Sequence, residues 1–269
     1  MPLFDAHCHL QDARLLPHLD TVMRQASEAG VTRLMCCGSH EQDWPLLPDI
    51  ADRFPGVSLS FGLHPWYIGA RAPGWLDRLK AQLTARPSAV GEIGLDHALA
   101  HTTFADQESV FLDQIHLANE LKRPVTFHCR RAWGRMKELL DEAGWPAYGF
   151  VLHSYSGSAE LVEPLTRRGA FFSFSGALTF EQNRKGREAL EAVPLDRLLI
   201  ETDAPDMLPQ AERACPGIIR NTGKPINTPG ALVLVARTVA ALRRLTLEEV
   251  AAITYRNAST LCVGGGQTP

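Results

Sequence analysis

Short runs of apolar and β-branched residues recur along the chain of 269 residues, and stretches with helical periodicity separate most of them. Each run has the length of a β-strand and ends near glycine, proline or a polar residue. Strands that alternate with helices pair in parallel through crossover connections. We therefore predict eight parallel strands, in the runs at residues 3–9, 33–38, 57–65, 89–96, 124–130, 149–157, 170–176 and 197–205.

The segments between these runs carry helix signals. Residues 15–30 end on Gly30, a residue suited to the end of a helix. In residues 104–121, Phe104 and Phe111 fall on one helical face together with later apolar residues, which predicts that they are buried together. Further helices are predicted at residues 158–169 (with a kink at Pro164), 184–193 and 246–262.

Eight strand-and-helix units in a chain of this length match a (β/α)8 TIM barrel. An open, doubly wound sheet is the alternative, but nothing in that architecture stops it at eight strands. Thr246 and Glu249 form a capping box that opens an extra C-terminal helix. Without an internal linker or repeat, residues 1–262 are expected to form a single domain, followed by a short flexible tail at 263–269.

Composition narrows the class of protein. The 45% hydrophobic content is enough for a large core, and the formal net charge of −3 gives no overall positive field for nucleic acid. The six cysteines form no C-x-x-C pair, which favours free thiols in a reducing compartment. No secretory signal is visible, and the apolar segment at 230–242 is too short for a bilayer and contains Arg237. We expect a cytoplasmic protein without membrane contact and infer no obligate protein partner.

Histidines and acids occur at the downstream ends of six of the predicted strands. Alternation on a strand turns His7 and His9 to the same face, where they can bind a metal or lie as polar residues on a half-exposed strand. The carboxyl ends of barrel strands meet at one face, which is where barrel enzymes build their active sites. The residues expected to converge there are His7, His9, His64, Glu92, His128, His153 and Asp203.

Imidazoles and carboxylates in this number exceed what one tetrahedral zinc ion needs, and suit two cations that share a carboxylate. Nitrogen and oxygen ligands without thiolate favour zinc, manganese, iron, cobalt or nickel, and magnesium less strongly. Cys8 and Cys129 neighbour two of the histidines, but strand alternation turns both thiols outward toward the helices. Asp5 and Asp96 can orient the imidazoles or can make turn and cap contacts.

The ordered set of motifs resembles the TatD family of metal-dependent hydrolases, within the wider amidohydrolase-like group of metal-dependent barrels. The likeness covers nearly the whole chain. The matching pieces are "FDAHCHL", "GLHPW", "GEIGLD", "PVTFHCRRA", "VLHSYSGS", "FFSFSG" and "LLIETDAP", in family order.

The resemblance implies two divalent cations. It assigns one to His7, His9, Glu92 and Asp203, and the other to Glu92, His128 and His153, with Glu92 bridging. The implied reaction is hydrolysis by a metal-activated water, with Asp203 as the group that accepts its proton.

Substrate contacts are less defined. His64 can donate to a ligand or to the substrate, or can be a structural turn histidine. Arg130 can hold a phosphate or form a salt bridge at the rim. The long loop at 204–230 adds Arg213, Arg220 and Lys224, which can contact a phosphate backbone or remain solvated.

Three departures from the family pattern bear on function. "HSYSG" at 153–157 replaces the usual H-C-F-S-G, and His97 follows G-L-D where an aromatic residue is common. "INTPG" at 226–230 lacks the glutamate of the R-N-E-P motif, which bears on nuclease activity but not on the metal site. The leading hypothesis is cleavage of phosphodiester bonds in DNA from an exposed end. The alternatives are hydrolysis of a small ester, amide or phosphoester at the same site, and a non-catalytic metal-binding barrel.

Overall fold

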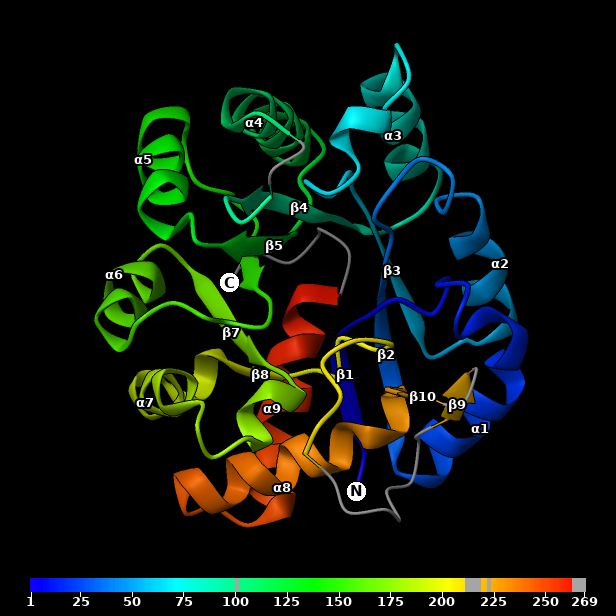
Figure 1. Cartoon of the computed structure of the whole chain (residues 1–269), viewed down its shortest axis with the longest axis vertical. Helices are drawn as coiled ribbons and strands as arrows, with labels where there is room; N and C mark the ends of the chain where they lie inside the picture. The colour runs from blue at the N-terminus through cyan, green and yellow to red at the C-terminus, as the bar shows by residue number, and fades with distance from the viewer. Residues whose placement is uncertain (100–101, 211–218, 222–223, 263–269) are drawn as a thin grey trace.

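The computed structural model describes residues 1–99, 102–210, 219–221 and 224–262. Eight parallel strands stand side by side in chain order, each hydrogen-bonded to the next (Figure 1). Their residues are buried almost throughout, as expected for a parallel sheet covered on both faces. The strands are β1 (Leu3–Cys8), β2 (Val31–Cys37), β3 (Val57–Phe61), β4 (Ala89–Asp96), β5 (Val125–Arg130), β6 (Phe150–Leu152), β7 (Ala170–Phe174) and β8 (Leu198–Ile200).

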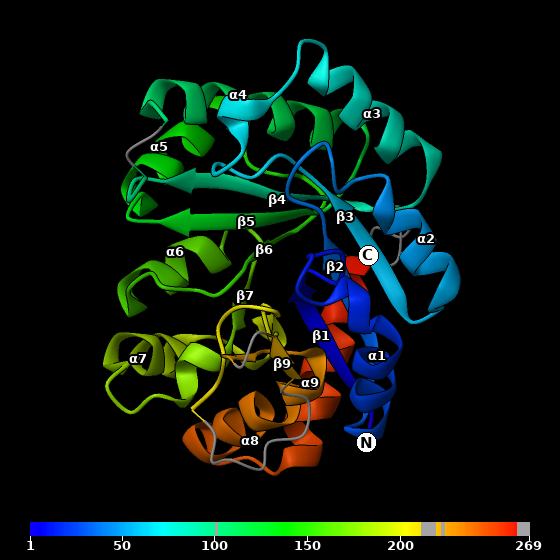
Figure 2. The same ribbon diagram turned by 45° about the vertical axis from the view of Figure 1, so that its right-hand side comes forward.

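Helices follow the strands and form the outer layer of the barrel (Figures 1 and 2). Their apolar faces and the outward-facing strand residues form one large hydrophobic cluster. The helices are α1 (Leu19–Glu28), α2 (Leu46–Arg53), α3 (Trp75–Ala85), α4 (Phe104–Glu120), α5 (Trp133–Ala143), α6 (Val162–Thr166), α7 (Arg184–Ala192), α8 (Leu232–Arg243) and α9 (Leu247–Cys262). The predicted (β/α)8 barrel with an extra C-terminal helix is confirmed.

The seam between β8 and β1 is joined beyond the end of β8. The amide of Asp203 donates to the carbonyl of His7 at 2.9 Å, and the amide of His9 donates to the carbonyl of Ala204 at 2.7 Å. Asp5 adds to this seam, since its carboxylate accepts both the amide and the hydroxyl of Thr202, at 2.8 and 2.5 Å. The first strand and the segment after the last are therefore fixed to one another next to the candidate site.

A second, smaller cluster fills the inside of the barrel, and α9 contributes to it. Ala258 and Leu261 of α9 belong to this cluster together with Phe4 and Phe171, and the ring of Tyr255 lies edge-on to that of Phe4 at 5.8 Å. Thr246 caps the helix as predicted, because its hydroxyl accepts from the amide of Glu249 while its own amide donates to the Glu249 carboxylate. The extra helix thus packs against the interior residues of the barrel.

Three local expectations are wrong. Phe104 is 47% exposed, because it is the first residue of α4 and stacks on His97 at the rim instead of facing the barrel. The kinked helix expected around Pro164 is reduced to a 3-10 turn and the five residues of α6. The loop at 204–230, expected to be irregular, contains a small antiparallel pair, β9 (Ile219–Asn221) with β10 (Lys224–Ile226). The predicted tail at 263–269 lies outside the described residues.

Within the described part of the chain, no helix is both long enough and apolar enough to cross a membrane. Four cysteines in that part are free and buried: Cys8, Cys36, Cys37 and Cys129. Burial raises the pKa of each of these thiols. Cys8 and Cys129 belong to the cluster between strands and helices, which confirms that they point away from the barrel axis.

Candidate metal centre

All seven side chains expected at the carboxyl ends of the strands lie in one buried cluster. Glu92 lies on β4 and has its carboxylate at the centre of this cluster. The other members come from strand ends or the residues just beyond them: His7 on β1, His128 on β5, and His9, His64, His153 and Asp203 after β1, β3, β6 and β8. The strands bring together residues that are separated by up to 196 positions in the chain (203 − 7).

The two carboxylate oxygens of Glu92 face two different groups of histidines. Oε2 lies 3.2 Å from Nε2 of His7 and 3.4 Å from Nε2 of His9. Oε1 lies 3.1 Å from Nδ1 of His128 and 2.8 Å from Nε2 of His153. One buried carboxylate therefore joins two sets of nitrogen donors, an arrangement that allows it to bridge two cations.

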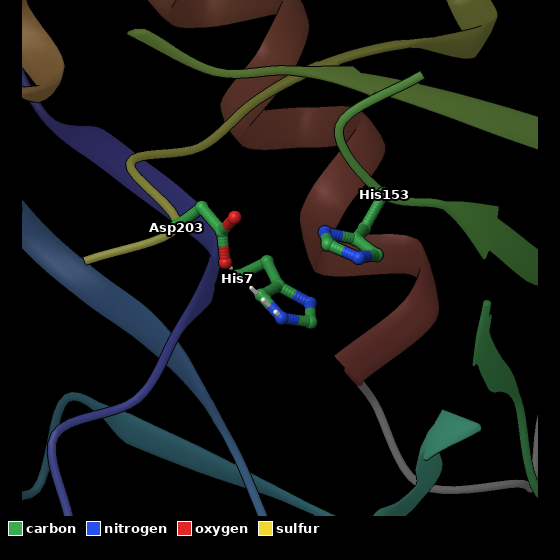
Figure 3. Close-up of side chains that lie close together, drawn as sticks. All are labelled: His7, His153 and Asp203. Carbon is green, nitrogen blue, oxygen red and sulfur yellow. Dashed lines mark ion pairs between the residues drawn. The ribbon is translucent and has the colours of Figure 1, made fainter. Parts of the chain in front are cut away.

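Asp203 completes the first of these groups. Its Oδ1 lies 3.8 Å from Nε2 of His7 and 3.5 Å from Nε2 of His9. Figure 3 shows Asp203 pointing toward His7, with the ring of His153 on the other side. The rings of His7 and His153 stack at 4.1 Å between centroids, so the two groups of donors adjoin.

The close approach of β4 and β5 depends on Gly94, in the sequence "GEIGLD". A Cβ on Gly94 would lie 1.8 Å from the carbonyl oxygen of His128, and its φ of +153° disfavours other residues. Gly94 and His128 are partners in the register between the two strands. The glycine therefore lets β5 approach near enough for His128 to reach Glu92.

Further contacts orient the imidazoles. Nδ1 of His9 bonds the carbonyl of Cys37 at 2.8 Å, which leaves Nε2 for the centre. Nε2 of His128 lies 3.2 Å from Oδ2 of Asp96, so Asp96 has the orienting role that the sequence suggested as one of two options. Asp5 has no such contact with an imidazole ring, because its carboxylate binds Thr202 and the backbone amide of His7.

Glu201, directly after β8, was missed by the sequence reasoning. It is fully buried, and its Oε1 lies 3.5 Å from Nδ1 of His153 and accepts the amide of Ser154 at 2.7 Å. The position of Glu201 at the end of a predicted strand, two residues before Asp203, was the available signal. Its contact with His153 is longer than the hydrogen-bonded contact of Asp96 with His128, and it places a second carboxylate beside the imidazole of His153.

His64 is held in one tautomer. The amide of Trp66 donates to Nδ1 of His64 at 3.1 Å, so this nitrogen keeps its lone pair and the ring proton sits on Nε2. Nε2 lies 3.2 Å from Oε1 of Glu92 and therefore donates to it. Burial, together with nearby imidazoles, lowers the pKa of His64 to about 4, which keeps the ring neutral. His64 is thus a donor to Glu92, although its nitrogen lies within range of the same centre.

The charges in the cluster are strongly coupled. Burial opposes ionisation of Glu92, but the surrounding imidazoles, chiefly His153, hold the pKa of this carboxyl well below its usual range. Burial also opposes a proton on His9, but contact with Asp203 and Glu92 raises the pKa of His9 to about 9. Burial likewise opposes a proton on His153, but Glu92 and Glu201 raise the pKa of His153. Two buried carboxylates are therefore neutralised by protons on imidazoles, and divalent cations can replace those protons.

The donor set consists of imidazole nitrogens and carboxylate oxygens. The nearest described thiol, Cys37, touches His7 on Nδ1 at 3.4 Å and stays protonated because burial raises its pKa. His7 Nε2 and His9 Nε2 approach to 3.2 Å, both directed at Glu92. This convergence of lone pairs and anionic oxygens fits a divalent cation.

Comparison with known proteins assigns the chain to a family. Residues 4–262 match the family model described as TatD related DNase. The chain belongs to this TatD family. A protein of Bacillus subtilis named uncharacterized metal-dependent hydrolase YabD is 31% identical over 262 residues, which cover 96% of this chain and 98% of the relative. A Salmonella typhimurium protein named 3'-5' ssDNA/RNA exonuclease TatD is also 31% identical, over 264 residues, with coverages of 96% and 98%.

The fold matches a solved TatD homologue as well. The crystal structure of YjjV from Escherichia coli superimposes with a TM-score of 0.87 at 27% sequence identity, and the match covers 97% of each chain. The TatD family resemblance that the motifs indicated is confirmed, and so is its implication that the chain is a metal-dependent hydrolase of ester bonds.

Residues at each of the three departures from the TatD pattern make specific contacts in the structure. Ser154, in "HSYSG", lies 2.8 Å from Ser175 between their hydroxyl oxygens, and His97 stacks on Phe104. In "INTPG", the side chain of Asn227 donates to the carbonyls of Thr202 and Asp206, each at 2.8 Å. That motif therefore ties the loop after β8 to the seam beside Asp203.

Of the residues predicted to contact substrate from β5 and the long loop, the structure describes the side chain of Arg130 alone. Arg130 is exposed at the carboxyl end of β5, opposite Asp96 in the strand register. Arg220 lies on β9, but its side chain is outside the described residues, as is that of Lys224; Arg213 is outside them entirely. Contact of these residues with a phosphate backbone stays a prediction.

Proposed function

We propose that this chain is a binuclear metal-dependent nuclease that cleaves phosphodiester bonds of single-stranded nucleic acid, DNA in particular, from an exposed end. The observation that carries the proposal is that the two carboxylate oxygens of Glu92 face different groups of histidines, at 2.8 to 3.4 Å. The exonuclease name of relatives at 31% identity supports the choice of substrate.

In this proposal, His7, His9, Glu92 and Asp203 hold one divalent cation. Glu92, His128 and His153 hold the second. Bound there, the cations would lower the pKa of a water molecule toward neutrality and withdraw charge from a phosphoryl oxygen. The nitrogen and oxygen donors favour zinc, manganese, iron, cobalt or nickel, with magnesium as a weaker candidate.

Asp203 is the residue of the centre best placed to move a proton. Burial opposes its ionisation, but contact with His9 and other imidazoles lowers the pKa of Asp203, so it is a carboxylate at neutral pH. Its side chain is 12% exposed, against 4% for Glu92. We therefore assign Asp203 to accept a proton from the attacking water. As the water oxygen bonds to phosphorus and the phosphorus–oxygen bond to the leaving nucleoside breaks, Asp203 returns that proton to the leaving oxygen.

Glu92 and His64 are assigned positioning roles. Glu92 holds the two halves of the centre together, while the Nε2 proton of His64 fixes Oε1 of Glu92. Arg130, exposed beside the centre, is assigned to the phosphate of the substrate. The buried, free thiols agree with a reducing compartment and support a cytoplasmic location.

The test is purified protein supplied with manganese, magnesium or zinc and given single-stranded DNA labelled at either end. We expect metal-dependent loss of nucleotides from one end and at least a hundredfold slower loss with Asp203→Asn. Salt separates the alternative substrates, because turnover of DNA should fall steeply as salt rises, whereas turnover of a small neutral ester should hardly change. Degradation no faster than in Asp203→Asn, with turnover of a small phosphoester intact, would replace the nuclease with the second substrate class.

A further inference from the structure

Large exposed hydrophobic side chains gather on one face of the barrel. Eight such residues occur in the described part of the chain, and six of them lie in loops that follow strands or in the first turn of the next helix. These positions are at the carboxyl ends of the strands, on the same face as Glu92 and its histidines. The six are Leu16, Leu46, Trp66, Tyr67, Phe104 and Met207.

Trp66 lies against the metal centre itself. The residue is 46% exposed, while its indole N–H donates to Oδ2 of Asp96 at 2.8 Å. The same oxygen lies 3.2 Å from Nε2 of His128. The indole also stands edge-on to His64 at 5.2 Å between ring centroids. Trp66, with its exposed aromatic surface, is therefore held in position by Asp96, which also orients His128, and by the edge contact with His64.

Tyr67 places a second aromatic ring next to the first. It is 37% exposed and stacks on His40 at 4.5 Å between centroids. The segment is tightly turned, since the amide of Tyr67 donates to the carbonyl of His64 at 2.9 Å and that of Trp66 to the His64 ring. The rings thus have defined positions, while part of the surface of each residue stays open to solvent.

We propose that Trp66 and Tyr67 form a stacking site for unpaired bases next to the bond to be cleaved. Stacking on aromatic rings is how proteins hold single-stranded nucleic acid without reading its sequence, because every base has a π-face. Arg130 is exposed and lies in register with Asp96, the residue that binds Trp66, and is assigned to a flanking phosphate. The choice of a nucleic-acid base as occupant rests on the function proposed above.

The experiment compares two oligonucleotides of equal charge. Metal-loaded protein is titrated with fluorescent hexathymidylate and with an abasic oligomer of the same length, both with nuclease-resistant phosphorothioate links, and binding is followed by anisotropy. We expect the wild-type chain to prefer the base-bearing oligomer by about tenfold or more, which corresponds to the stacking of one base. Trp66→Ala should reduce this preference to about twofold or less, and Tyr67→Ala should reduce it in part.

Two matched variants separate stacking from other effects. Trp66→Phe keeps a ring but loses the N–H to Asp96, and should retain most of the preference. Tyr148→Ala removes an equally exposed ring, 37%, in the connection between α5 and β6 on the opposite face, and should leave both affinities unchanged. Equal binding of the two oligomers by the wild-type chain, or a preference that survives Trp66→Ala, overturns the stacking site.

Hydrolysis of the unmodified oligonucleotide is measured in parallel. Cleavage without a preference for bases would support the nuclease and reject the stacking site. A preference that depends on Trp66, without any cleavage, would support the stacking site and reject the nuclease.

Discussion

Replacing Glu92 by glutamine tests the bridging role directly. The substitution keeps the shape of the side chain and removes one negative charge. Both oxygens of Glu92 face imidazoles, Oε2 at 3.2 Å from His7 and Oε1 at 2.8 Å from His153. If Glu92 bridges two cations, the variant should lose affinity for both of them. If Glu92 serves one cation, or is only a hydrogen-bond acceptor, at least one cation should remain bound tightly.

The expected magnitude follows from the geometry. If a cation lies no farther from Glu92 than Nε2 of His7 does, at 3.2 Å, one unit of its charge and the charge of Glu92 interact by about 5 kcal/mol at an effective dielectric constant of 20, the value that suits buried groups. Removing the charge of Glu92 is therefore expected to weaken each site by roughly a thousandfold or more. Glu92→Asp, which keeps the charge but shortens the side chain, should weaken binding less than Glu92→Gln.

Isothermal titration calorimetry with zinc and with manganese, together with metal analysis after gel filtration, measures both affinity and stoichiometry. Asp49→Asn, a change outside the metal centre on α2, is the matched charge control and should bind as the wild type does. Circular dichroism of the metal-free variants reports whether the barrel is intact. Two equivalents bound by Glu92→Gln, with affinity within tenfold of the wild type, would refute the bridging argument.

Four further predictions follow from the same structure. Asp203→Asn should lower kcat by about 10²- to 10⁴-fold and change KM far less, which steady-state kinetics on a labelled oligonucleotide would measure. A KM that rises as much as kcat falls would contradict the assignment of Asp203 to proton transfer. Because the pKa of His9 is raised to about 9 without metal, a proton competes with the cation, and calorimetry should find metal affinity rising from pH 6 to 9; a pH-independent affinity would contradict this. The hydrogen bond to Asp43 raises the pKa of His40, so in Asp43→Asn an NMR titration should find the pKa of His40 back near 6.5. The loss of folding stability in this variant should be largest between about pH 4 and 6.5 and should shrink as pH rises through the pKa of His40 in the folded wild type. A loss of stability that grows with pH would contradict the argument. Gly94→Ala should cost at least about 3 kcal/mol, since its Cβ would meet the backbone of the neighbouring strand, and chemical denaturation showing less than 1 kcal/mol would contradict the close approach.

The sequence determined the architecture and the seven side chains that converge at the candidate metal centre. Apolar runs separated by helical segments require parallel strands with crossovers, and eight of them close into a barrel. Once the barrel is predicted, the order of the strands sets where a histidine or acid such as His128 or Asp203 lies around the barrel, and its place at the carboxyl end of a strand sets its position along the axis. That is why residues far apart in the chain could be expected to converge before any coordinates were known.

Contacts between distant residues needed the tertiary structure. Which oxygen of Glu92 faces which histidines depends on side-chain rotation and strand stagger, and no local pattern encodes either. The tautomer of His64 depends on a turn that brings the amide of Trp66 to its ring. Glu201 was missed because it faces His153 from another strand. Phe104 was misjudged because it begins α4 at the rim, where helical periodicity no longer implies burial. Periodicity and spacing predict the face of an element on which a residue lies. Distances between side chains across the barrel are set only when the strands pair, so no local pattern in the sequence predicts them.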